Sequence, residues 1–155
     1  PHARIDSVDF SAGMLDRAAR RLRPEDRARV TLRQADALST DFPPDTYDAV
    51  TTLFFLDCFS DAQVRAFIEH LRPALTPNAV WLHADFALPS RGFHRLRAQT
   101  MLALMLAFFR WQTGLAVRAL PNSETLLHSA GFVPTADSSR QGGFIRSAVF
   151  SQTQE

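Results

Sequence analysis

Hydrophobic positions along the chain follow two patterns, short apolar runs typical of buried strands and stripes of helical period. Four short strands are predicted, at residues 3–9, 29–34, 47–53 and 79–86. Ser11 is a suitable N-cap for a helix whose apolar stripe runs from Met14 to Leu22. Ser60 and Gln63 have the spacing of a capping box and open a second helix. Strands that alternate with helices predict an α/β fold with a mostly parallel sheet.

The last third of the chain adds further elements to this pattern. Residues 93–111 carry a long apolar stripe and predict a helix. Asn122 or Ser123 caps a short helix that ends at Gly131. Residues 132–137 and 144–150 read as two strands in hairpin-like succession. Ligands of such sheets bind beyond the carboxyl ends of the strands, so the functional residues are expected there.

Composition narrows the function. The chain has 155 residues, of which 46% are hydrophobic, and 17 basic residues balance 16 acidic ones. This composition is typical of a folded globular domain, and the balanced charge argues against a nucleic-acid partner. Every basic residue is arginine, which excludes Schiff-base chemistry and the lysine of a phosphate-binding loop.

The cysteine count and the length of the apolar runs bear on the cellular compartment and on membrane association. Cys58 is the only cysteine, so no intrachain disulfide forms, and a reducing, cytoplasmic setting is expected. The longest apolar run, residues 101–109, has about half of the roughly 20 residues that a membrane span needs. No membrane span is predicted.

Two aspartates stand at the carboxyl ends of the first two predicted strands. Asp9 precedes a helix N-terminus, where a carboxylate can accept two hydrogen bonds from a ribose diol. Asp36 follows the second strand and can accept from an adenine amine. The alternatives are local: Asp9 as a helix cap or a solvated residue, and Asp36 as a turn residue.

With this context, four segments resemble class I S-adenosylmethionine-dependent methyltransferases in order and spacing, namely residues 8–18, 30–38, 47–57 and 71–78. The resemblance covers roughly residues 4–88. It implies a Rossmann-like sheet, mostly parallel, with an antiparallel strand near the C-terminal edge. It also implies S-adenosyl-L-methionine as the cofactor.

Carried over by position, the resemblance implies that Asp9 binds the cofactor ribose. The other cofactor-binding residues that it implies are Phe10 and Ser11 beside Asp9, Met14 on the adenine, Asp36 and Ala37 at the adenine edge, and Thr52, Leu53 and Phe54 near the methionine. The alternative for Met14, Leu53 and Phe54 is plain core packing.

Methyl transfer is an in-line displacement that proceeds largely through alignment, and a general base is needed only when the acceptor arrives protonated. Asp57, just past the third strand, and Asp85, near the end of the fourth, are the candidate catalytic residues. Asp57 has a second, structural interpretation, in which it caps the loop before Ser60. His83 is interpreted as a packed residue. No metal is predicted, because His83, Asp85 and His94 match no metal-binding pattern.

Residues 90–121 occupy the position where such enzymes insert a substrate-covering segment. This segment is expected to form a lid over an apolar small-molecule acceptor, or to bury the helix at 94–111 in a homodimer. A plain core helix is the third interpretation.

One feature departs from the family. Its glycine-rich turn lies roughly 20 residues before the ribose-binding acid, whereas the first glycine here is Gly13, beyond Asp9. We therefore expect a single, partial methyltransferase domain over 1–155 that lacks its first βα unit, either as a fragment or by natural truncation. The absent initiator methionine favours a fragment. The absent strand is expected to leave two neighbouring strands with unpaired edges and the isolated chain unstable.

Three functional hypotheses follow. The first is S-adenosylmethionine-dependent methyl transfer to a small-molecule acceptor. The second is a methyltransferase-like module that binds a partner or dimerises without catalysis. The third is a nicotinamide-dependent oxidoreductase, which also holds a ribose with an acid after its second strand. The hairpin-like tail favours the methyltransferase sheet over the third.

Overall fold

The computed structural model describes residues 3–87, 121–140 and 143–153. Within it the chain divides into two compact units, residues 1–42 and 43–155, and each is described by itself. The predicted helix at 93–111 and the substrate-covering segment at 90–121 lie almost entirely outside the described residues. Interpretation of that segment as a lid or a dimer surface therefore stays a prediction.

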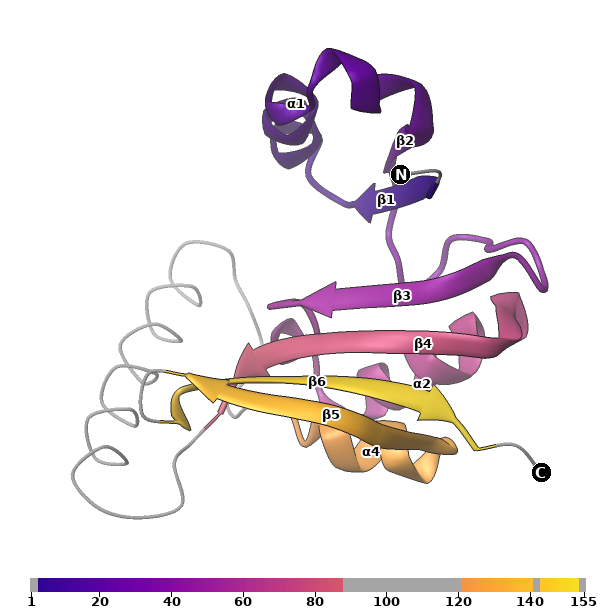
Figure 1. The fold of residues 1–155 in the computed structure, drawn as a ribbon, viewed down its shortest axis with the longest axis vertical. Coiled ribbons are helices and arrows are strands. Elements are labelled where there is room, and N and C mark those ends of the chain that lie inside the picture. The colour runs from indigo at the N-terminus through magenta and orange to yellow at the C-terminus, as the bar shows by residue number, and fades with distance from the viewer. Residues whose placement is uncertain (1–2, 88–120, 141–142, 154–155) are drawn as a thin grey trace. The chain divides into compact units, whose positions relative to one another are not determined.

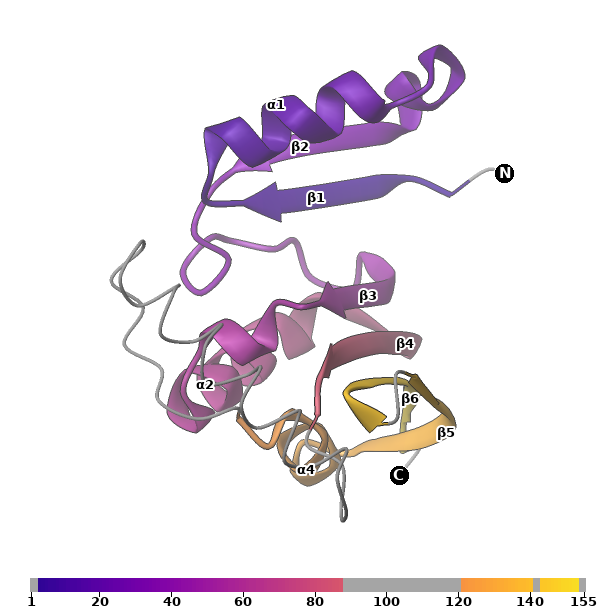
Figure 2. The same cartoon turned by 90° about the vertical axis from the view of Figure 1, so that its left-hand side faces the viewer.

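The first unit is a two-stranded parallel sheet with one long helix. Strands β1 (Ile5–Asp9) and β2 (Val30–Gln34) pair in register from end to end, and helix α1 (Ala12–Arg21) lies along one face of the pair (Figure 2). A 3-10 helix, η1 (Pro24–Arg29), leads into β2. The predicted N-cap is confirmed, because the Ser11 hydroxyl accepts a hydrogen bond from the Met14 amide at 3.3 Å.

The second unit is a four-stranded mixed sheet in the order β3-β4-β6-β5 (Figure 1). Its strands are β3 (Tyr47–Leu53), β4 (Leu75–Phe86), β5 (Phe132–Arg140) and β6 (Ile145–Gln152). Strands β3 and β4 run parallel, and β6 lies antiparallel between β4 and β5. The expected α/β class and the antiparallel strand near the C-terminal edge are confirmed.

Two helices cover one face of this sheet, α2 (Asp61–Leu71) and α4 (Ser123–Ser129) (Figure 2). Short 3-10 helices, η2 (Leu56–Cys58) and η3 (Arg72–Ala74), flank α2. The centre of the core is Trp81, whose fully buried ring makes edge contacts with Phe67 at 6.1 Å and Phe132 at 5.4 Å between centroids. Aromatic edge contacts of this kind hold the sheet and its helices in one geometry.

Strand β4 begins four residues earlier than the apolar pattern predicted, at Leu75 rather than at residue 79. Its pairing with β3 is irregular there, because the register shifts between Tyr47 and Ala49. Pro77 lies in this stretch and has no amide hydrogen for a ladder bond, so an irregular start accommodates it. The hydrophobic pattern alone did not reveal this extension, since its residues are largely polar or small.

Strands β1 and β3 each lie at the edge of their own sheet. Among the described residues, β1 pairs only with β2, and β3 pairs only with β4. An edge strand presents backbone groups that a further strand can bind. The sequence analysis expected β1 and β3 to lack a neighbouring strand. In the structure, each of these two strands lies at an open edge of its sheet.

Helix α2 provides a test of how far local capping stabilises the fold. The Ser60 hydroxyl accepts from the Gln63 amide at 3.4 Å, and the Gln63 side-chain oxygen accepts from the Ser60 amide at 3.1 Å, which confirms the predicted capping box. Substituting Ser60→Ala is expected to lower the free energy of unfolding by about 1 kcal/mol in urea titrations. Ser60→Thr keeps the hydroxyl and serves as the control. Equal losses in both variants would contradict the capping role.

Candidate functional site

The first candidate residues lie at the carboxyl ends of β1 and β2. Asp9 is the last residue of β1, and its Oδ1 accepts a hydrogen bond from the Ser11 amide at 2.7 Å. Asp36 follows β2, and its Oδ1 accepts from the Leu38 amide at 2.9 Å. The turn interpretation of Asp36 is correct, whereas Asp9 is not the helix cap, because Ser11 is the N-cap of α1 and Asp9 makes a turn just before it. Each of these bonds uses only one carboxylate oxygen. The second oxygen of each side chain is the one that a ligand would use.

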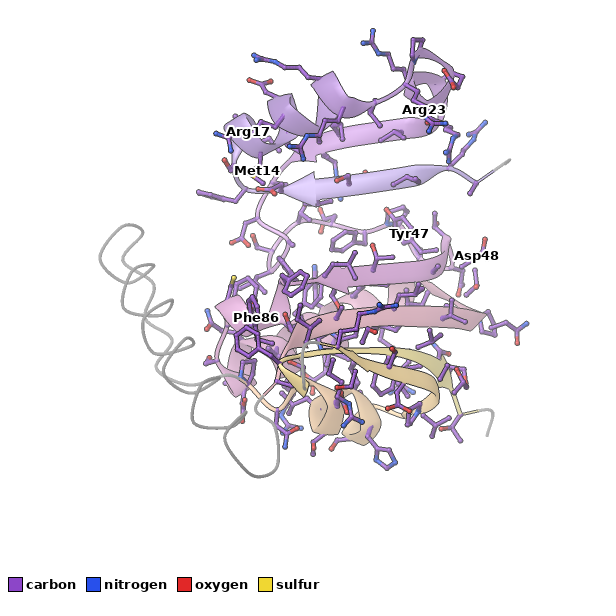
Figure 3. All side chains as sticks on the ribbon, turned by 60° about the vertical axis from the view of Figure 1, so that its left-hand side comes forward. Met14, Arg17, Arg23, Tyr47, Asp48 and Phe86 are labelled. Carbon is purple, nitrogen blue, oxygen red and sulfur yellow. The ribbon has the colours of Figure 1, made fainter. Side chains whose placement is uncertain are left out.

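Two large apolar side chains accompany Asp9 without joining a core. Phe10 is 79% exposed and Met14 is 52% exposed. Figure 3 shows Met14 at the end of the first unit where β1 terminates. Core packing is therefore not the role of Met14 in this structure. Exposed apolar groups beside a carboxylate are suited to the flat face of a nucleobase and the polar edge of a ribose.

In the second unit, strand β3 ends in a strained turn. Phe54 has φ +52°, a left-handed conformation that costs a bulky residue about 1–3 kcal/mol. A 2.7 Å hydrogen bond from its amide to the Ala84 carbonyl holds it there. Leu53 is 59% exposed and Phe54 is 44% exposed, so core packing does not account for them either. Strain of this kind concentrates at functional sites.

Strand β4 places its chemistry-bearing residues on one face. Trp81, His83 and Asp85 alternate along the strand and are all buried, Asp85 being only 7% exposed. By strict geometry neither carboxylate oxygen of Asp85 forms a hydrogen bond within the described residues, but the side chain and the backbone of Asp57 interact with this carboxyl. Nε2 of His83 lies 3.6 Å from Asp85 Oδ2. A buried carboxyl beside a second carboxyl is an arrangement typical of acid–base sites.

Burial also governs the acid–base behaviour of this cluster. It raises the pKa of Asp85 to about 8, and repulsion from the Asp57 carboxylate adds to the shift. Burial raises the pKa of Asp57 as well. The Cys58 thiol has its pKa raised to about 12, by burial and by Asp57, which makes it a poor nucleophile. The two aspartates that the sequence suggested therefore lie side by side and titrate together.

A cavity of about 480 Å³ opens at Asp85. Among the described residues, its wall includes Asp85, Phe86, Asn122, Glu124 and Arg146. The Arg146 guanidinium is already paired, with its Nε donating to Glu124 Oε1 at 2.6 Å. The wall of the cavity therefore combines a buried carboxyl with the ion pair between Arg146 and Glu124.

Three aromatic rings lie in a row from the strained turn at Phe54 along the carboxyl end of β4. Phe86 lies between Phe54 and Phe144, with ring centroids 5.0 and 5.1 Å away. In Figure 3, Phe86 lies at the end of β4, whereas Tyr47 and Asp48 lie at the opposite end of the sheet. The site of the second unit is thus at the carboxyl ends of β3 and β4, where an α/β sheet binds ligands.

Comparison with known proteins agrees with this geometry. The family model described as a methyltransferase domain matches residues 1–78, half of the chain. The chain belongs to the methyltransferase domain family.

A demethylmenaquinone methyltransferase of Clavibacter sepedonicus is 29% identical over 156 aligned residues, covering 92% of this chain and 62% of the relative. This chain therefore spans less than two thirds of that relative's length.

Solved structures share the fold of this methyltransferase domain. A possible exported protein of Bordetella parapertussis has a TM-score of 0.70 at 20% identity, over 99% of this chain and 55% of its own. An S-adenosylmethionine-dependent methyltransferase of Aquifex aeolicus has a TM-score of 0.61 at 14% identity, over 97% of this chain and 69% of its own. The resemblance seen in the sequence is confirmed, and family membership favours methyl transfer over the nicotinamide hypothesis.

The structure places the predicted site residues of the methyltransferase domain in two groups. Within the first unit, Asp9, Phe10, Met14 and Asp36 lie at the strand ends. Within the second, Leu53 and Phe54 are exposed, while Thr52 is buried and its hydroxyl bonds to Trp81 and His83. Cofactor contacts of Ser11, Ala37 and the other residues remain predictions.

The interpretation of His83 as a packed residue is confirmed, because it is buried and lies 3.2 Å from the Thr52 hydroxyl. Glu124 and Arg146 were not predicted to lie at the site. The alternation of His83 with Asp85 along the strand was visible, but its hydrogen-bond partner lies on another strand. Glu124 and Arg146 are 22 residues apart and meet only through the fold. No helix in the described part of the chain is long and apolar enough to cross a membrane. Within the same residues, no three metal-ligating side chains come together.

The raised pKa of Asp85 predicts how stability depends on pH. Between the ordinary pKa near 3.8 and the folded value of about 8, the folded protein holds a proton that the unfolded chain has lost. Stability therefore falls as pH rises through this window, by at most about 1.4 kcal/mol per pH unit.

Asp85→Asn mimics the protonated side chain and removes this loss. The variant is expected to match the wild type near pH 4 and to be increasingly more stable up to pH 8, in urea unfolding at several pH values. Asp57 and His83 interact with Asp85, so the comparison reports the titration of Asp85 together with its effect on these two neighbours. A difference that does not change with pH would contradict the assignment.

Proposed function

We propose that this protein transfers a methyl group from S-adenosylmethionine to a small-molecule acceptor. The acceptor binds in the cavity beside Asp85, and the first unit holds the nucleoside portion of the cofactor. The observation that carries the proposal is Asp85 itself, a buried carboxyl in the wall of a cavity at the end of β4, next to a second carboxyl, that of Asp57.

The residues of the first unit suit the cofactor. A ribose diol needs a carboxylate acceptor, and Asp9 has one oxygen beyond the one that accepts from the Ser11 amide. An adenine ring needs apolar surface, which Phe10 and Met14 present to solvent. Asp36 offers a second acceptor at the neighbouring strand end. When bound, S-adenosylmethionine supplies a methyl group activated by its positive sulfur.

Asp85 is proposed to act as the general base. An acceptor hydroxyl that enters the cavity gives its proton to the Asp85 carboxylate, and the oxygen or the conjugated carbon that gains the electron pair attacks the methyl carbon. The pair of the carbon–sulfur bond remains on sulfur, so charge balances. A base with a pKa of about 8 matches a weakly acidic hydroxyl better than an ordinary aspartate does.

An aromatic acceptor suits this cavity. Phe86 lies on its wall, in the row formed by Phe54, Phe86 and Phe144. The relative from Clavibacter sepedonicus carries demethylmenaquinone in its name, which denotes a naphthoquinone ring. We propose a hydroxylated aromatic compound as the acceptor, with the ring against Phe86 and the hydroxyl toward Asp85.

Replacing Asp9 tests the cofactor assignment. Asp9→Ala is expected to weaken binding of S-adenosylhomocysteine by about 1.5–3 kcal/mol, because hydrogen bonds to a charged carboxylate are lost. Isothermal titration calorimetry on the full-length gene product measures this loss.

Two further variants separate this role from local structure. Asp9→Asn retains an oxygen that can accept from the Ser11 amide but loses the charge, so it is expected to fold normally and still bind weakly. Asp16→Ala removes an exposed carboxylate from α1 and is expected to bind as the wild type does. Unchanged affinity in Asp9→Ala would remove the ribose role. Absence of binding to the folded wild-type protein would favour a non-catalytic interaction module.

The pH dependence of transfer tests Asp85. With 1,4-dihydroxynaphthalene as the acceptor, kcat/KM is expected to rise with pH and to level off above about pH 8, as Asp85 loses its proton. Formation of S-adenosylhomocysteine is the readout. Asp85→Asn is expected to lower kcat/KM by about 10²- to 10⁴-fold and to abolish the rise of kcat/KM with pH.

Asp57→Asn is the matched comparison. It removes the neighbouring charge that helps to raise the Asp85 pKa. The rise of kcat/KM is therefore expected to occur at lower pH, while methyl transfer persists. If kcat/KM of Asp85→Asn rises with pH as it does in the wild type, a group other than Asp85 is responsible for the rise.

A further inference from the structure

An ion pair lies in the wall of the cavity beside Asp85. Arg146, on β6, donates from its Nε to Oε1 of Glu124, on α4, at 2.6 Å. Arg146 is directly opposite Asp85 in the pairing of β6 with β4. Both members of the pair therefore border the space in which the proposed acceptor binds. The chemistry assigned to Asp85 above uses neither of them.

The guanidinium of Arg146 has a second carboxylate neighbour. Its Nη2 lies 3.9 Å from Oδ2 of Asp137, which is on β5, the strand next to β6. An arginine stays protonated in proteins, so one permanent positive charge lies between two carboxylates. The three side chains together carry a net negative charge. Because α4, β5 and β6 contribute one residue each, the fold creates this arrangement.

The other titratable side chains described in this wall do not add positive charge. Burial lowers the pKa of His83 to about 4, so its ring is uncharged near pH 7. Asp85 is either an uncharged carboxyl or a carboxylate, depending on the pH. Among the described residues that line the cavity, Arg146 therefore supplies the positive charge, and Glu124 compensates it.

A ligand that carries its own carboxylate meets an unfavourable surface here. To enter the cavity the carboxylate must lose water, and Arg146 compensates this loss poorly because its charge is already paired. Repulsion from Glu124 and Asp137 opposes binding further. We infer that Glu124 is a specificity-determining residue, which binds Arg146 and thereby excludes acceptors that carry a carboxylate. The inference rests on the proposed function and narrows its substrate class to uncharged hydroxylated aromatic compounds.

An uncharged acceptor is not penalised in the same way. The bond to Glu124 uses Nε of Arg146, and the terminal nitrogens of the guanidinium carry further N–H donors. A neutral oxygen of the acceptor can bind such a donor without bringing a charge into the cavity. A site that rejects one class of ligand by leaving its charge unpaired gains specificity against that class.

Removing the charge of Glu124 has a predictable consequence. Arg146 is then left with Asp137, whose carboxylate is 3.9 Å away. A guanidinium without a close partner binds carboxylates well, because its planar fork matches their geometry. The same position is therefore expected to admit the ligands that it excludes in the wild type.

Two acceptors that differ in charge test this inference. 4-Hydroxy-2-naphthamide and 4-hydroxy-2-naphthoate share the ring and the hydroxyl, and their carboxamide and carboxylate groups have nearly the same shape. Isothermal titration calorimetry measures the dissociation constant of each compound with the full-length gene product and with its Glu124→Gln variant. The wild type is expected to bind the naphthamide about tenfold or more tightly than the naphthoate. In Glu124→Gln the ratio of the two constants is expected to change by about tenfold or more in favour of the naphthoate.

Two further variants show whether the change depends on the ion pair. Glu69→Gln removes an exposed carboxylate from α2, outside the described wall of the cavity, and is expected to keep the wild-type preference. In the double variant Glu124→Gln/Arg146→Gln no guanidinium is left to bind the naphthoate, so most of the gain is expected to disappear. High salt is expected to narrow the wild-type preference, because Glu124 and Arg146 are partly exposed to solvent.

Several outcomes would overturn the inference. These are a wild-type protein that binds the naphthoate as tightly as the naphthamide, a preference that is unchanged in Glu124→Gln, an equal change in Glu69→Gln, and a folded wild-type protein that does not bind the naphthamide. Failure of the proposed function has a different signature. In that case the binding preference is as expected, but neither compound yields S-adenosylhomocysteine when S-adenosylmethionine is supplied.

Discussion

The requirement that a buried indole N–H be hydrogen-bonded organises the second unit. Trp81 is fully enclosed between Phe67 and Phe132, and its ring can only be held there if Nε1 finds an acceptor. The acceptor is Thr52, on the adjacent strand. This bond ties the hydrophobic core to the strand that ends in the strained Phe54, so packing in the core and geometry at the strand end are coupled.

Burial on the same face of β4 has opposite effects on its two titratable side chains. It disfavours the charged form of each, which lowers the pKa of His83 to about 4 and raises that of Asp85 to about 8. Near neutral pH the folded site therefore contains an uncharged imidazole beside a largely protonated carboxyl. Groups whose pKa values are moved apart by their surroundings are typical of acid–base sites. The fold achieves this with two positions of one strand and the neighbouring Asp57.

Local patterns in the sequence predicted the elements and the strand-end acids because those features depend on near neighbours. The Ser11 cap and the box formed by Ser60 and Gln63 are examples, since each contact spans three residues. The aspartates at strand ends followed from the same logic. The core role of Thr52 was not predicted, because its partners are 29 and 31 residues away and face it only across the pairing of β3 with β4. Exposure of Leu53 and Phe54 likewise depends on the turn that Phe54 adopts.

Asp9 shows why the local and functional interpretations of a residue need not compete. Its bond to the Ser11 amide holds the carboxylate just before the N-cap of α1. A carboxylate held in this way loses little freedom on meeting a ligand, so less of the binding free energy is lost to ordering. The same holds for Asp85, which is fixed by burial and by its interactions with Asp57. In both units, then, the structural constraint on an aspartate is what prepares it to bind.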